Sequence, residues 1–217
     1  MSPIALQSPV LLNSDQAHYL IHVMRLKEGN QILLFNGKHG EWLSTVTHAS
    51  KKAVAGLPIQ CVRPQQKEPG PALYFAPIKK DPLSFLIQKA TELGVSSLHP
   101  VLTERTVHPH INLDRLTAIA IEAAEQSRRL TVPLITKPIS LKDVPKPFYF
   151  LDESGSSPMI SSFSDLRTAA FILGPEGGFS EKEFSFLRDN GIGVSLGPLI
   201  LRAETAALAV LAYGLLQ

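Results

Sequence analysis

Two glycine-bearing segments in the C-terminal part of the chain carry the residue types best suited to binding and chemistry. The first, Phe171–Ser180, has the sequence FILGPEGGFS and sets three glycines around Glu176 after an apolar run. Glycine lets bare backbone approach a ligand closely, and open α/β sheets bind ligands at the carboxyl ends of their strands. An ordinary strand-to-helix turn is the alternative, because Ser180 and Glu183 would form a capping box for a following helix. Three glycines around one acid favour a ligand-binding loop.

The second segment, Ser195–Ala206, has the sequence SLGPLILRAETA and leads into an Ala/Leu-rich terminal helix. Arg202 and Glu204 lie at the start of that helix, where they can equally be a surface charge and a first-turn residue. If the two strand ends lie side by side, their backbone N–H and C=O groups can bracket an adenine and a ribose. The two segments therefore predict one nucleoside pocket, provided that the fold brings them together.

Several common chemical signatures are absent. The sequence contains no G-x-G-x-x-G, G-x-x-x-x-G-K-[ST], G-x-S-x-G or H-E-x-x-H motif, which disfavours dinucleotide, nucleoside-triphosphate, serine-esterase and zincin sites. His18 and His22 have the spacing of metal ligands on a helix, but no third ligand lies nearby, so we expect a helix flank and no metal. Cys61, the single cysteine, excludes an internal disulfide and is predicted to be a core residue rather than a nucleophile.

Composition indicates a globular protein of one or two domains, with 217 residues of which 44% are hydrophobic and 18% charged. The longest apolar run, Ala206–Leu216, is shorter than the roughly 20 residues of a membrane span. No signal peptide is visible, so a cytoplasmic protein is expected. The net charge is only +2, but residues 1–70 hold seven Lys and Arg against four acidic residues. This excess fits a small nucleic-acid-binding module, or sampling variation alone.

The segment Arg63–Pro71, RPQQKEPGP, divides the chain. Its three prolines and lack of apolar residues predict a linker between domains at 1–68 and 71–217. The first part predicts a short helix, capped by Asn13 or Ser14, followed by short strands that suggest a small β-barrel. Those strands are expected at Gln31–Phe35, Glu41–Thr47 and Ala53–Val62.

After the linker, apolar strand candidates alternate with helices, which predicts a mostly parallel sheet with helices on both faces. Asp81 and Pro82 are expected to cap and open one helix. Leu116, Ile119 and Ala120 share one face of another. The strands are expected at Ala72–Ile78, Leu98–Leu102, Leu134–Thr136, Phe148–Leu151, Ala169–Leu173 and Val194–Leu196.

Motifs along most of the chain resemble those of the RsmE family, the bacterial 16S (small-subunit) ribosomal RNA uridine-N3 methyltransferases of the trefoil-knotted SPOUT superfamily. The two glycine segments are similar to the family's LGPEGGFS and LG-x-x-ILR-x-ETA motifs. Four further motifs occur in family order: HYLIHVMRL at His18–Leu26, QKATELGV at Gln88–Val95, TERT at Thr103–Thr106 and EAAEQSR at Glu122–Arg128. The occurrence of these motifs in family order, with compatible spacing, makes the resemblance specific.

The resemblance implies an α/β fold with a C-terminal trefoil-knotted SPOUT methyltransferase domain and a small N-terminal PUA-like β-barrel that binds RNA. It also implies S-adenosylmethionine as cofactor, 16S ribosomal RNA or the small ribosomal subunit as partner, and a homodimer with its active site at the subunit interface. Two features depart from the family. Leu199 occupies a position where the family usually has arginine, and the chain opens with SPIAL in place of a basic, aromatic stretch.

The methylation of uridine N3 needs a cation to stabilise the developing uracil anion and a group to accept the N3 proton. Arg202 is the candidate cation, because a guanidinium is always charged and can bind a planar edge through two bonds. Glu204 or Glu176 could accept the proton, although either could instead bind backbone. Family position and exposed backbone indicate cofactor contacts at Leu173, Gly174, Glu176, Gly177, Leu196, Gly197, Ile200 and Leu201. The candidate RNA contacts are Arg25, Arg105, Arg128 and Arg129, with a solvated helix end as the alternative for the last two.

Other functions remain open at this point. A related knotted methyltransferase could act on a ribose 2′-hydroxyl or on another base. Leu199 makes a catalytically weakened, ribosome-associated RNA-binding factor conceivable. A hydrolase has only the general α/β pattern in its favour.

Overall fold

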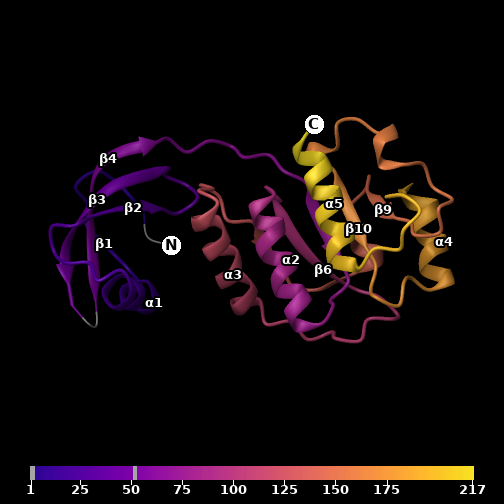
Figure 1. Cartoon of the computed structure of the whole chain (residues 1–217), viewed down its shortest axis with the longest axis horizontal. Coiled ribbons are helices and arrows are strands. Elements are labelled where there is room, and N and C mark those ends of the chain that lie inside the picture. Colours follow the sequence, from indigo (N-terminus) through magenta and orange to yellow (C-terminus); the bar gives the residue numbers. More distant parts are fainter. Residues whose placement is uncertain (1–2, 51–52) are drawn as a thin grey trace. The chain divides into compact units, whose positions relative to one another are not determined.

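The computed structural model describes residues 3–50 and 53–217. Ser2 of the opening stretch, and Lys51 and Lys52 of the basic N-terminal region, lie outside the described residues. The chain forms two compact units, residues 1–67 and 68–217, which Figure 1 shows in indigo to purple and in magenta to yellow.

Unit 1 is built on an antiparallel sheet with the strand order β1-β4-β3-β2. Its strands are β1 (Val10–Leu11), β2 (Gln31–Phe35), β3 (Glu41–Ala49) and β4 (Val54–Arg63). A short helix, α1 (Ser14–His18), continues into a π-helical turn, η1 (Tyr19–Val23). The predicted strands are confirmed to within a few residues at their ends, and the core gathers around Ala17, Val46 and Val54.

The start of α1 follows from a reciprocal cap. Asn13 Oδ1 accepts from the Gln16 N–H at 2.9 Å, and Gln16 Oε1 accepts from the Asn13 N–H at 3.3 Å. This capping box satisfies N–H groups that a helix leaves unpaired at its start, so Asn13, rather than Ser14, is the cap. The rings of His18 and His22 lie 4.5 Å apart, and the described residues contain no group of three or more His, Cys, Asp or Glu that could hold a metal ion.

Two predictions for unit 1 are wrong. Cys61 is exposed rather than buried, because the unit's core lies at the other end of β4, around Val54. Arg63 is not part of a linker but ends β4, where its guanidinium donates twice to the Glu41 carboxylate across the sheet, at 2.8 and 3.0 Å. A two-bond ion pair of this kind fixes the register of the two strand ends.

Unit 2 is an α/β unit with a parallel sheet in the order β11-β9-β10-β5-β6-β7, and β8 extends the pairing of β6. Its strands are β5 (Ala72–Phe75), β6 (Ser97–Leu102), β7 (Leu134–Ile135), β8 (Ile139–Ser140), β9 (Tyr149–Leu151), β10 (Ala170–Leu173) and β11 (Ile192–Val194). Its helices are α2 (Lys80–Glu92), α3 (Leu113–Gln126), α4 (Glu181–Asn190) and α5 (Ala203–Leu215). Single 3₁₀ turns are η2 (Leu141–Asp143), η3 (Ile160–Ser162) and η4 (Leu166–Thr168).

The sheet of unit 2 is covered on both faces, as predicted. Successive residues of β5 point to opposite sides: Leu73 and Phe75 pack in the core that α2, α3 and α5 share, whereas Tyr74 packs in the core that includes Leu187 of α4. This alternation is the two-residue period of a strand. Figure 1 shows α2, α3 and α5 along the sheet and α4 beyond β9.

Several helix and strand boundaries differ from the sequence-based expectation, and β5 ends at Phe75 rather than Ile78. The cap position of α2 is Lys79, so Asp81 lies inside the first turn rather than at the cap, and Pro82 follows it in that turn. Strand β11 ends at Val194, because Ser195 leaves β9 and pairs instead with Met159 in an isolated bridge. From this edge of the sheet the chain returns to α5, which packs on α2 and β10. The trefoil knot implied by the family resemblance stays a prediction.

Candidate functional site

The strand order of unit 2 brings three strand ends together. Strands β11, β9 and β10 are parallel neighbours, so the loops after Val194, Leu151 and Leu173 leave the sheet at the same edge. A pocket of about 690 Å³ lies there, within the size range of small-molecule sites. Its lining includes every predicted cofactor and catalytic residue except Gly177: Leu173, Gly174, Glu176, Leu196, Gly197, Ile200, Leu201, Arg202 and Glu204.

The loop after β10, residues 174–179, is a tight turn that we call the glycine loop, and Ser180 follows it as the cap of α4. Gly178 has φ +68°, a left-handed conformation that favours glycine, and its N–H donates to the Pro175 carbonyl at 2.8 Å. At Gly174, a Cβ would lie 3.0 Å from the ring of Phe179, so the glycine lets that ring fold back over the loop. Gly177 is outside the pocket lining, and its carbonyl accepts a hydrogen bond from Arg105 Nη1 at 2.8 Å.

The loop after β11, residues 195–202, is the second wall, which we call the LILR loop. Gly197, with φ +117°, donates its N–H to Ser195 Oγ at 3.3 Å. Leu199 and Ile200 are 75% and 80% exposed. The loop ends at Arg202, which occupies the cap position of α5 without a side-chain capping bond.

Two charged side chains stand at the start of α5. Arg202 is exposed, Glu204 is half-buried in the first turn, and both line the pocket. Neither side chain forms a hydrogen bond or ion pair with another described residue, and the same holds for Glu176. The N-terminal end of a helix also carries unpaired N–H groups and a partial positive charge. The start of α5 therefore carries a group that can stabilise negative charge, Arg202, and a group that can accept a proton, Glu204.

Sequence reasoning missed the third wall of the pocket, which comes from the loop after β9. Leu151, Asp152 and Glu153 line the pocket. Asp152 is buried, and it accepts from Ser157 Oγ at 2.6 Å and from the Ser154 N–H at 2.9 Å. Burial by itself raises the pKa of the Asp152 carboxyl, but these bonds and the charge of Arg188 outweigh it and lower the pKa. The signal was available, because acidic residues directly follow the predicted strand 148–151.

The pocket has the chemistry of a site for a cationic nucleoside. Its lining includes four carboxylates, from Asp152, Glu153, Glu176 and Glu204, and two cations, from Lys79 and Arg202. Leu151, Leu173, Leu196 and Leu201 add apolar surface that suits a planar base. The residues present therefore fit S-adenosylmethionine, whose sulfonium is positively charged. Pro82 of α2 and Phe184 of α4 also line the pocket, and no local sequence pattern marks them as pocket residues.

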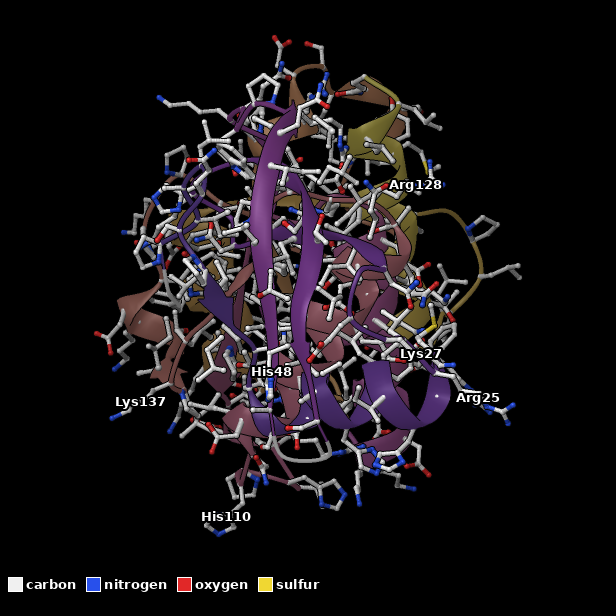
Figure 2. All side chains as sticks on the ribbon, turned by 90° about the vertical axis from the view of Figure 1, so that its left-hand side faces the viewer. Arg25, Lys27, His48, His110, Arg128 and Lys137 are labelled. Carbon is white, nitrogen blue, oxygen red and sulfur yellow. The ribbon has the colours of Figure 1, made fainter. Side chains whose placement is uncertain are left out.

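The candidate RNA contacts are spread over several elements. Arg25, in unit 1, and Arg128 are exposed and have φ of +54° and +57°. Arg128 directly follows the last turn of α3, a position where a left-handed residue commonly ends a helix. Figure 2 shows Arg25 and Lys27 projecting outward on the same side of unit 1.

Arg129 belongs to the fold rather than to an RNA-facing surface. Its side chain is only 9% exposed and donates to the carbonyls of Thr91 and Val95, at 2.7 and 3.0 Å. Its Nε lies 3.6 Å from the Glu68 carboxylate, which also accepts from the backbone N–H groups of Leu130 and Thr131. Arg129 thus anchors the end of α3 to α2 and to the start of unit 2, which leaves little of its guanidinium for RNA.

A family model described as the RNA methyltransferase domain matches residues 66–214, and one described as the RNA methyltransferase PUA domain matches residues 12–58. The chain belongs to the RNA methyltransferase family. The predicted enzyme class and fold class, an α/β domain preceded by a PUA-like domain with an antiparallel sheet, are therefore confirmed. None of the helices in the described part of the chain is long and apolar enough to span a membrane.

Relatives of this RNA methyltransferase cover it almost completely. The ribosomal RNA small subunit methyltransferase E of Rickettsia conorii is 38% identical, over 97% of this chain and 91% of the relative. The protein of the same name from Bacillus subtilis is 32% identical, over 92% and 87%. Among solved structures, the methyltransferase E of Neisseria gonorrhoeae bound to S-adenosylmethionine has a TM-score of 0.87 and 28% identity, over 98% of this chain and 93% of that one. A putative methyltransferase from Legionella pneumophila with bound S-adenosylmethionine has a TM-score of 0.89 and 26% identity, with the same coverage.

Proposed function

We propose that this enzyme methylates N3 of a uridine in 16S ribosomal RNA, with S-adenosylmethionine as the methyl donor. The observation that carries the proposal is the meeting of the glycine loop, the LILR loop and the start of α5 around one pocket. Relatives named for the small ribosomal subunit, and solved neighbours that hold S-adenosylmethionine, support the donor and the class of substrate.

Different residues of the pocket would hold different parts of the donor. S-adenosylmethionine supplies an activated methyl group on a sulfonium. The backbone of Gly174 and Gly197 and the apolar side chains of Leu173, Leu196 and Leu201 would hold its nucleoside. The carboxylates around the pocket favour the sulfonium charge, which lets the enzyme distinguish the methyl donor from the product of transfer, whose sulfur is neutral.

The residues at the start of α5 act on the uridine. As uridine N3 loses its proton, negative charge develops on uracil O2 and O4, where the guanidinium of Arg202 can stabilise it. The half-buried carboxylate of Glu204 is one acceptor for the N3 proton, and Glu176, on the exposed rim of the glycine loop, is the other. Positioning by both loops supplies much of the remaining rate.

RNA binding is assigned to unit 1 and to the exposed arginines Arg25, Arg105 and Arg128. Leu199 offers no charge at a position where the RsmE family usually has arginine, so this enzyme has one cation fewer at the pocket rim. A ribosomal RNA substrate gives the proposed activity a cytoplasmic location. We keep the homodimer in the proposal, because half-exposed apolar side chains of α5, such as Leu215 at 45%, remain outside the core. Light scattering of the purified protein would measure its mass in solution and so test the homodimer.

Two measurements test the function. Calorimetric titration with S-adenosylmethionine should show binding, and the absence of binding would instead support an RNA-binding factor without catalysis. Small ribosomal subunits from a strain lacking the enzyme should then gain N3-methyluridine on incubation with enzyme and donor, as detected by mass spectrometry of nucleosides. A 2′-O-methylated nucleoside or a different methylated base would overturn the N3 assignment while leaving the methyltransferase in place.

A further inference from the structure

The TERT motif, which the proposed chemistry does not use, forms a hydrogen-bonded turn after β6. The Thr106 N–H donates to the Thr103 carbonyl at 3.1 Å. The Thr103 N–H in turn donates to Thr106 Oγ1 at 3.0 Å, and the two hydroxyl oxygens lie 2.8 Å apart. The threonines thus close the turn on itself, and this leaves the backbone N–H of Glu104 and the side chain of Arg105 to bond elsewhere.

One carboxylate joins this turn to the end of the glycine loop. Glu183, in the first turn of α4, accepts from the Ser180 N–H through Oε2 at 2.9 Å and from the Glu104 N–H through Oε1 at 2.8 Å. The first bond belongs to the capping box of α4. The second reaches a residue 79 positions earlier in the chain and contributes nothing to helix capping. Both are bonds to a charged acceptor, which are stronger than neutral ones.

A second bond joins the same two segments on the other side of Phe179. Arg105 Nη1 donates to the Gly177 carbonyl at 2.8 Å. The stretch from Gly177 to Glu183 is therefore tied to the TERT turn at both of its ends. Between these ties lie Gly178 and Phe179, which line the pocket.

We propose that Glu183 is a positioning residue for the methyl donor. Together with Arg105 it clamps the glycine loop to the TERT turn and so holds Gly178 and Phe179 in the conformation that binds the donor. This inference rests on the proposed function, because it assigns the pocket to S-adenosylmethionine. It gives the TERT turn a role on the donor side of the reaction, in addition to any contact that Arg105 makes with RNA.

The test compares Glu183→Gln with two matched controls on the same helix start. A glutamine has only one side-chain oxygen, so it must lose at least one of the two bonds and turns an N–H group toward the other donor. Ser180→Ala removes the acceptor of the Glu183 N–H, at 3.3 Å, and so weakens the cap without touching the clamp. Glu181→Gln removes the same charge from the same helix turn, where Glu181 has no side-chain bond to another described residue.

Dissociation constants for S-adenosylmethionine are measured by calorimetry without RNA, and melting temperatures are recorded for every variant. Glu183→Gln should raise the dissociation constant, and the KM for the donor, about tenfold, the scale of one charge-assisted hydrogen bond. The kcat at saturating donor should change less than threefold. Ser180→Ala should lower the melting temperature and Glu181→Gln should change little, and neither should alter donor affinity by more than about twofold.

Equal donor affinity for Glu183→Gln and the wild type would overturn the clamp while leaving the proposed function intact. Equal losses of donor affinity in Glu183→Gln and Ser180→Ala would do the same. Failure of the wild type to bind the donor would overturn the proposed function itself. If Glu183→Gln does not fold, Arg105→Ala breaks the other tie and should weaken donor binding in the absence of RNA. Unchanged binding in that variant would equally contradict the clamp.

Discussion

The two loops that form the pocket are held in different ways. The glycine loop is fixed by an internal bond between Gly178 and Pro175 and by ties to Arg105 and to Glu183 at its end. Among its described residues, the LILR loop has one side-chain hydrogen bond, from the Gly197 N–H to Ser195 Oγ, and it exposes Leu199 and Ile200. One wall is therefore built by the surrounding chain, whereas the other presents apolar and charged side chains outward.

This difference separates binding from chemistry. A wall that is fixed before the ligand arrives costs less entropy on binding, so the glycine loop suits the methyl donor. Arg202 and Glu204, whose side chains have no partner among the described residues, stand at the end of the other wall, where the target base would meet the donor. The two loops should consequently respond to substitution in different measurements.

The largest effect is expected at the LILR loop. Arg202→Ala should lower the rate of methyl transfer about 10²–10³-fold, the scale of losing one group that stabilises developing charge. The dissociation constant for S-adenosylmethionine should stay within about twofold, because the glycine loop is untouched. Single-turnover assays and calorimetry measure the two quantities. A wild-type rate in a variant that still binds the donor would refute the role of Arg202.

A smaller effect, on binding rather than rate, is expected at the glycine loop. Gly178→Ala places a Cβ at φ +68° and 3.2 Å from Glu153 Oε1, at a backbone cost of about 1–2 kcal/mol. Donor affinity should fall about tenfold, as measured by calorimetry. Gly29→Ala is the control, because Gly29 has φ +87° in unit 1 with nothing within 4 Å of an added Cβ. Gly29→Ala should lower the melting temperature without changing donor affinity. If both variants changed donor affinity equally, the glycine loop would have no special role in binding the donor.

Adding a positive charge to the LILR loop should strengthen RNA binding rather than weaken a function. Leu199→Arg should tighten RNA binding about threefold to tenfold at low salt and steepen its salt dependence by about one phosphate contact. Donor affinity should not change. Ile192→Arg adds the same charge at the amino end of β11, at the far end of that strand from the pocket, and serves as control in filter-binding titrations. An equal gain from both variants would mean that net charge, rather than position, is responsible.

The smallest effect is expected in the sheet, where His99 should influence stability rather than binding or rate. Burial lowers the pKa of His99, which stacks on Tyr74 at 4.4 Å and bonds with Thr136 and Ser97. The unfolded chain therefore takes up this proton at a higher pH than the folded protein. Stability should fall as the pH drops below about 6.5 and level off below the folded pKa. Denaturant unfolding should show that His99→Gln reduces this pH dependence, and an unchanged dependence would exclude His99 as its source.

Local patterns in the sequence determined most of the elements and the family. Alternation and capping residues predicted the strands of unit 1, the helix face of Leu116 and Ala120, and the capping box at Ser180, since each depends on neighbours a few residues away. The glycine segments likewise identified two of the three pocket walls and nearly all of their lining residues. Only the joining of the two segments in one pocket depended on which strands are neighbours.

Features that depend on contacts between residues remote in sequence were decided only by the tertiary structure. The placement of β9 between β10 and β11 brought Asp152 and Glu153 to the pocket, and no spacing in the sequence encodes that order. Arg129 and its neighbour Arg128 are both arginines at the end of a helix, but packing against Thr91 and Val95 buried only the first. The bond between Glu183 and Glu104 joins residues that are remote in sequence. Such contacts arise from the burial of whole faces of the sheet, a cooperative effect that acts on many residues together and leaves no local signature.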